Sequence, residues 1–113
     1  MTIDAINAQK SEFIRNAEDY WTQIHEGNSD AANRKESANR KIVNQWTEAG
    51  ITVAILSPFL IHTSSAVRLA SAAYLIKTDA KDQAVWVLRK LKESEPGLIS
   101  SSAGAVLRIN KVY

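Results

Sequence analysis

The stretch that most limits the possible folds runs from Ser64 to Leu75 and reads SSAVRLASAAYL. Apolar residues recur in it at helical spacing, namely Val67, Ala70, Ala73 and Tyr74. Four further residues widen this stripe: Leu69, Ala72, Leu75 and Ile76. The spacing predicts a helix that buries one side. Because the stripe is wide, we expect neighbours on more than one side of this helix. One of the two serines at its start is the candidate N-cap.

The rest of the chain shows the same helical spacing between residues that break helices. The pattern predicts helices over about 4–25, 30–49, 80–92 and 98–110. Gly27 and Asn28 are expected to break the chain after the first of these, with Ser29 or Asp30 as the cap of the second. Gly50 is the expected stop of the second helix.

A third helical segment, over 51–61, contains Pro58. Proline lacks the amide proton that the preceding turn needs, so Pro58 either starts a helix or kinks one, and the sequence leaves both open. Trp46 is in register with apolar residues of its helix and is expected in the core. Trp86 lies off the apolar stripe of its helix, which leaves its burial undecided.

The second half of the chain contains an internal repeat, in which two consecutive helical hairpins resemble each other. A shift of 32 residues lays Val67 on Ile99 and Leu75 on Leu107, and the preceding helices agree, with Leu56 falling on Leu88. The same shift carried backward gives only a faint match. Repeats of this length are typical of stacked helical hairpins. The sequence therefore predicts an all-α fold, a HEAT/armadillo-like α-α superhelix of about three helical hairpins, as one domain over residues 1–113.

Composition and charge fit an ordinary globular chain. The 113 residues are 45% hydrophobic and include no cysteine, and the N-terminus shows no signal peptide, so we expect a cytoplasmic protein. The net charge is +2 but uneven. Residues 1–30 carry six acids and two bases, whereas residues 31–113 carry twelve bases and six acids. The charges either decorate solvated faces, or the acidic first helix faces a basic partner.

The residue patterns associated with catalysis are lacking. There is no glycine-rich phosphate loop, no histidine pair at metal-ligand spacing and no nucleophile triad, so we expect no enzyme activity, no cofactor and no metal. His25 and His62 are expected at helix ends. Arg68 either joins a hydrogen-bond ladder between repeats or contacts a partner. A weaker hypothesis places nucleic acid in a basic groove formed by Arg34, Arg40, Lys41 and Arg68.

Four stretches occur in an order that resembles a known family: SDAANRK, SSAVRLASAAYLI, AVWVLRKL and GLISSSAGAVLRI. Together they resemble a bacterial family of small HEAT-like domains of unknown function, over roughly Ala31 to Ile109. The most specific part is 62–75. That family often ends in a tryptophan after the last leucine, whereas this chain continues with Arg108, Ile109 and Asn110.

Members that look like this occur among immunity proteins of bacterial toxin systems, including contact-dependent growth inhibition. The resemblance implies that this chain binds a cognate toxin protein, a nuclease domain, and blocks its active site. Since a nuclease cleft is usually basic, the expected contacts are mainly acidic: Glu12, Glu18, Asp19, Glu26 and Asp30, with Arg68. The alternatives are a general protein-interaction scaffold and a nucleic-acid-binding helical repeat.

Overall fold

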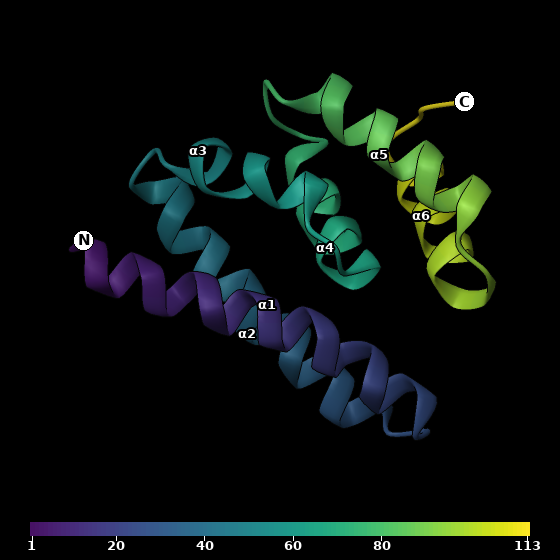
Figure 1. Ribbon diagram of the computed structural model, residues 1–113, viewed down its shortest axis with the longest axis horizontal. Helices are drawn as coiled ribbons and strands as arrows, with labels where there is room; N and C mark the ends of the chain where they lie inside the picture. Colours follow the sequence, from purple (N-terminus) through teal and green to yellow (C-terminus); the bar gives the residue numbers. More distant parts are fainter. The chain divides into compact units, whose positions relative to one another are not determined.

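All the secondary structure of the chain is helical in its computed structural model, which describes residues 1–113 (Figure 1). The elements are α1 (Ile3–His25), α2 (Ser29–Glu48), α3 (Thr52–Leu56), the 3₁₀-helix η1 (Ser57–Ile61), α4 (Ser65–Leu75), α5 (Lys81–Ser94) and α6 (Gly97–Ile109). The predicted all-α class is confirmed. Two compact units form, one from Met1 to Thr52 and one from Val53 to Tyr113.

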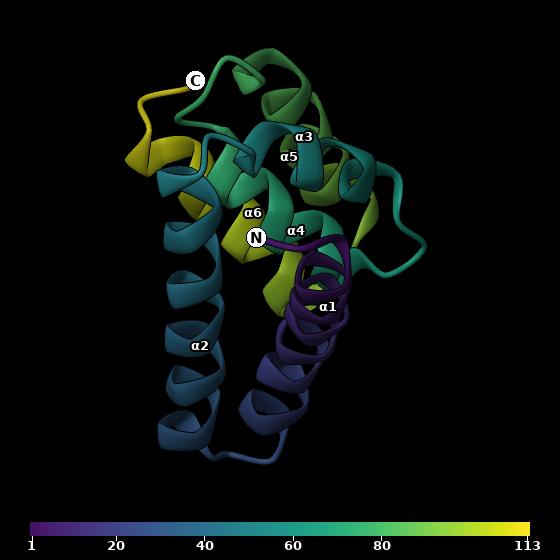
Figure 2. The ribbon, with the colours of Figure 1, turned by 90° about the vertical axis from the view of Figure 1, so that its left-hand side faces the viewer.

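The first unit is an antiparallel hairpin in which α1 and α2 lie side by side (Figure 2). The turn between them follows from local chemistry. Gly27 has a φ of 78°, and the amide beyond it, that of Asn28, donates to the Gln23 carbonyl at 2.9 Å. The Asn28 side chain then accepts from the Ala31 amide at 3.0 Å. The cap of α2 is therefore Asn28, and the prediction of Ser29 or Asp30 was wrong, because Asn28 both ends the turn and caps the next helix.

The core of this hairpin centres on Trp46 and Phe13, neither of which is exposed. Their rings pack with centroids 5.8 Å apart at an interplanar angle of 43°. The indole Nε1 of Trp46 donates to Gln9 Oε1 at 2.8 Å, so its polar edge is also satisfied. The predicted core position of Trp46 is confirmed.

Two buried asparagines join the middle of the hairpin. Asn16 Nδ2 of α1 donates to Asn39 Oδ1 of α2 at 3.0 Å, and Asn39 Nδ2 donates to the Phe13 carbonyl at 3.1 Å. Both side chains are buried. Apolar spacing in the sequence does not mark this pair, because both residues are polar. Its hydrogen bonds satisfy polar groups that would be costly to bury alone.

The segment around Pro58 resolves the alternative that the sequence left open. Gly50, with a φ of 72°, ends α2, and the next amide, Ile51, donates to the Trp46 carbonyl at 2.9 Å, as expected for a helix stop. After α3, the 3₁₀-helix η1 begins with Pro58 in its first turn. Pro58 therefore starts a new helical turn, where its missing amide proton leaves no hydrogen bond unmade.

The second unit packs η1, α4, α5 and α6 together. Ser64 caps α4 by accepting from the Val67 amide at 3.4 Å, which confirms the predicted cap. Val67, Ala72 and Leu75 of α4 are buried, in agreement with the wide apolar stripe. The centre of the stripe was predicted wrongly. Three of its residues, Ala70, Ala73 and Tyr74, are only half-buried, and the fully buried line includes Ser71 instead.

Outside this core, α5 carries the most exposed tryptophan. Its buried face consists of Ala84, Val87, Leu88 and Leu91. Trp86 points away from that face and is 62% exposed. Lys90 Nζ lies 5.5 Å from the centroid of the Trp86 ring, a cation–π contact one helical turn along α5.

Replacing Ser71 with alanine is expected to stabilise the second unit. The Ser71 hydroxyl is fully buried and has no hydrogen-bond partner. Removing it takes away an unsatisfied polar group and improves helix propensity, so Ser71→Ala should raise the free energy of unfolding by about 1 kcal/mol. Denaturant unfolding measures the change. Ser11→Ala, at an exposed position of α1 where the hydroxyl makes no hydrogen bond within the chain, isolates the propensity part. A Ser71→Ala gain no larger than that of Ser11→Ala would contradict the expectation.

Candidate functional site

Three of the predicted acidic residues follow one another at intervals of seven residues, close to two helical turns. Glu12 and Asp19 lie on one side of α1, and Glu26 is the C-cap residue just beyond it; we call the three the acidic row. Glu18 is adjacent to Asp19 and therefore lies about 100° around the helix axis. Asp30 is in the first turn of α2. The structure thus brings three predicted residues into line and places Glu18 and Asp30 elsewhere on the hairpin.

The acidic row is partly neutralised by α2. Asp19 Oδ2 lies 3.7 Å from Lys35 Nζ, and both side chains are roughly half exposed, at 49% and 40%. Exposed pairs of this kind contribute little to stability. Glu12, in contrast, takes part in no ion pair, so no basic side chain of the hairpin occupies its carboxylate.

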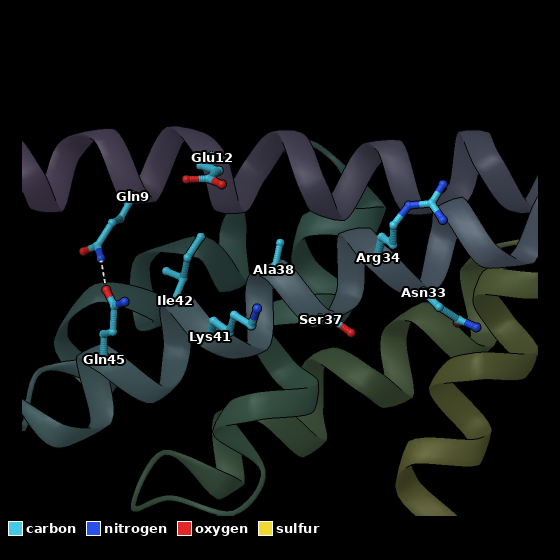
Figure 3. Close-up of a pocket in the computed structure, with 9 residues that line it drawn as sticks. All are labelled: Gln9, Glu12, Asn33, Arg34, Ser37, Ala38, Lys41, Ile42 and Gln45. Atoms are coloured by element: carbon cyan, nitrogen blue, oxygen red, sulfur yellow. Dashed lines mark hydrogen bonds between the residues drawn. The ribbon is translucent and has the colours of Figure 1, made fainter.

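A groove of about 540 Å³ runs along the hairpin (Figure 3). Every residue that lines it belongs to α1 or α2: Gln9, Glu12, Asn33, Arg34, Ser37, Ala38, Lys41, Ile42 and Gln45. Glu12 lines the groove from α1, and the apolar residues of the groove, Ala38 and Ile42, line it from α2. The groove is open to solvent along much of its length, so it is a surface groove and not an enclosed cavity.

Two cations of α2 line this groove and have no ion-pair partner. Arg34 and Lys41 are seven residues apart, which is about 10.5 Å along a helix. We call them the basic pair. Arg40 lies outside the groove, where its Nη2 bonds Glu36 Oε1 at 3.1 Å. Of the four cations considered for nucleic acid, the structure thus gathers only these two in one groove.

One end of the groove is closed by two amide side chains. Gln9 Nε2 donates to Gln45 Oε1 at 2.6 Å across the hairpin (Figure 3), while Gln9 Oε1 accepts from Trp46. Gln9 therefore connects the groove to the buried core. The groove residues Gln9, Asn33 and Gln45 were not predicted, because isolated amide side chains show no spacing pattern in the sequence before the helix packing is known.

The electrostatics of the hairpin also act on Tyr20 of α1. Burial raises the pKa of the Tyr20 phenol, and the negative charge of Glu36 on α2 raises it further. The ring packs edge-on against Trp21, with centroids 5.0 Å apart. Because both causes favour the neutral form, this phenol stays protonated throughout the neutral pH range.

Arg68 belongs to the second unit and is held by its own surroundings. Its guanidinium donates to the carbonyls of His62 and Thr63 at 2.7 and 3.1 Å, to Ser65 Oγ at 3.3 Å and to Glu95 Oε1 at 3.5 Å. The side chain is 25% exposed. These contacts connect the start of α4 to the end of α5, which corresponds to the structural alternative considered for Arg68.

Both histidines lie at helix ends, as expected. His25 is the last residue of α1. His62 follows η1, and its Nδ1 accepts from the Ser64 amide at 3.0 Å. No group of three or more His, Cys, Asp or Glu side chains is arranged to hold a metal ion. A helix both long and apolar enough to span a lipid bilayer is not found.

Comparison with known proteins gives no match: neither a protein-family model, nor a curated protein, nor a solved structure is significantly similar to this chain. The site geometry therefore stands by itself. The hairpin offers an acidic row, of which Glu12 lines the groove, and a basic pair on the opposite wall, an arrangement suited to recognising a charged macromolecular surface.

Proposed function

We propose that this protein is a cytoplasmic immunity protein that binds a cognate toxin domain, a nuclease of a contact-dependent growth inhibition or related system, and blocks its active site. The observation that carries the proposal is the acidic row of α1, Glu12, Asp19 and Glu26. A nuclease cleft must attract phosphates, so a row of carboxylates on a folded hairpin is a suitable plug for it.

The architecture we propose for the chain is a HEAT-like superhelix. The second unit supports it, because η1 packs on α4, and α5 packs on both α4 and α6. These elements repeat at the 32-residue spacing seen in the sequence, with Leu75 and Leu107 both buried. Stacked hairpins of this kind present extended surfaces for binding other macromolecules.

Inhibition would be steric, with charge setting the association rate. The hairpin contacts the rim and mouth of the cleft, and substrate is excluded by the volume of the bound protein. Opposite charges on the two surfaces accelerate encounter, an effect that falls with ionic strength. No group on this chain needs to react.

The charge of Glu12 is expected to matter to toxin binding far more than that of Glu18. Both are glutamates of α1 without an ion-pair partner, but only Glu12 belongs to the acidic row. Glu12→Lys should weaken the complex by about tenfold at low salt and flatten its salt dependence, whereas Glu18→Lys should change it by less than about threefold. Calorimetric titration at two salt concentrations measures both. Equal effects of the two variants would remove the acidic row from the interface.

The function itself is tested with the protein encoded next to this chain in the genome. Expressed alone that neighbour should arrest growth, and co-expression of this chain should restore it through a complex that survives purification. A harmless neighbour, or a toxic one that this chain neither binds nor neutralises, would overturn the proposal.

A second candidate function is binding of nucleic acid, which the surroundings of Trp86 favour. The ring is 62% exposed, lies beside Lys90 and is followed on α5 by Arg89, and bases stack on exposed aromatic rings flanked by cations. This alternative expects RNA or DNA to quench Trp86 fluorescence with a steep salt dependence. If the protein is instead a general scaffold, it should bind no nucleic acid, and the protein encoded next to it should not be toxic.

A further inference from the structure

The groove of the first unit lies between charges of opposite sign. Of the acidic row, only Glu12 lines the groove, from α1, whereas both members of the basic pair, Arg34 and Lys41, line it from α2. Across the hairpin, Gln9 meets Gln45, Asn16 meets Asn39 and Asp19 meets Lys35. This register places Lys41 near the turn that holds Glu12, and Arg34 near the turn that holds Asp19.

The basic pair is not neutralised by this arrangement. Asp19 pairs with Lys35, and Glu12 forms no ion pair with Lys41 although both line the groove. Both cations therefore remain available to an acceptor that enters the groove. A guanidinium binds a carboxylate or a phosphate through two parallel hydrogen bonds, and an ammonium binds either as a point charge.

The other residues of the groove favour a peptide carboxylate over a nucleic-acid phosphate as the acceptor. Asn33 and Gln45 carry side-chain amides, which both donate and accept hydrogen bonds as a peptide main chain does. Ala38 and Ile42 offer apolar contact to side-chain methylenes. Glu12, on the opposite wall, accepts a peptide N–H but repels a chain with a negative charge at every unit.

We propose that this groove binds an acidic peptide segment, two of whose carboxylates are held by Arg34 and Lys41. The groove extends from Asn33 to Gln45, about 18 Å along α2. That length holds about five or six residues of extended chain. The inference rests on the proposed function only in naming the donor of the segment, the toxin protein. The contact surface of the toxin would then carry charges of both signs, with a basic patch facing the acidic row and an acidic segment entering the groove.

The test uses the full chain and a fluorescein-labelled, C-terminally amidated hexapeptide in which two glutamates are separated by two serines, so that only two of its six residues are charged. Binding is followed by fluorescence anisotropy at low salt. The wild-type protein should bind the peptide saturably, and Arg34→Gln/Lys41→Gln should weaken binding by about tenfold or more. Lys10→Gln/Arg40→Gln is the matched control, because it removes two positive charges from the same hairpin outside the groove. That control should change affinity by less than about threefold.

Equal losses in the two double variants would overturn the proposal, since they would show general attraction to net positive charge. An inorganic oligophosphate of equal charge that binds as tightly as the peptide would also overturn it, because Glu12 should disfavour that ligand. No toxin is needed in these measurements. A protein that binds the peptide but neutralises no toxin would therefore separate this inference from the proposed function.

Discussion

Replacing Trp46 with alanine is expected to lower the free energy of unfolding by about 3–5 kcal/mol, the range for large buried aromatic residues. The side chain is not exposed at all and packs against Phe13. The variant leaves a cavity between α1 and α2. It also removes the donor that holds Gln9 Oε1, so the closed end of the groove should loosen. Denaturant unfolding followed by circular dichroism measures the loss.

Trp86→Ala is the matched control for this prediction. It removes the same side chain from an exposed position, and with it a cation–π contact to Lys90 of about 0.5–1 kcal/mol. The free energy of unfolding should therefore fall by no more than about 1 kcal/mol in Trp86→Ala. Comparable losses in the two variants would contradict the view that α1 and α2 are held together chiefly at Trp46.

Replacing Asn39 with alanine is expected to lower the free energy of unfolding by about 2–4 kcal/mol. Asn39 accepts a hydrogen bond from Asn16 and donates one to the Phe13 carbonyl, both in the buried interface between α1 and α2. The variant removes both bonds and leaves the Asn16 amide without this acceptor. Asn33→Ala, an exposed asparagine of the same helix, is the control and should be close to neutral.

A second variant tests the cause of that loss. Asn16→Leu/Asn39→Leu replaces both partners with apolar side chains of similar size, so that no polar group of the pair stays unsatisfied. It should recover part of the stability lost in Asn39→Ala. If the double variant is no more stable than Asn39→Ala, the loss comes from packing volume and not from unsatisfied hydrogen bonds.

Local signals in the sequence predict most helix boundaries. The Ser64 cap and the Gly50 stop follow from side-chain and backbone chemistry within a few residues, and the structure has both. Asn28 was misassigned because asparagine serves equally as a breaker and a cap. The stripe of α4 was centred wrongly because Ser71 is polar, and only the helices packed around α4 decide that it is buried.

The candidate site is predictable in its charges and not in its shape. Heptad spacing within α1 is visible in the sequence, and it places Glu12, Asp19 and Glu26 together. The groove depends on which side of α2 meets α1. The buried face around Trp46 sets that side approximately, and the exact register depends on amide contacts between residues 23 and 36 positions apart, for which the sequence offers no local pattern.

The Asn16–Asn39 contact also has a consequence for the geometry of the charges. An apolar seam tolerates axial slippage of one helix past the other, whereas a buried amide dimer tolerates almost none, because any offset strands its donors in a dry interior. The pair thus holds the backbones of α1 and α2 in one register, and with it the positions from which their carboxylates and cations extend. In the proposed complex, little backbone entropy would then be lost in ordering the hairpin.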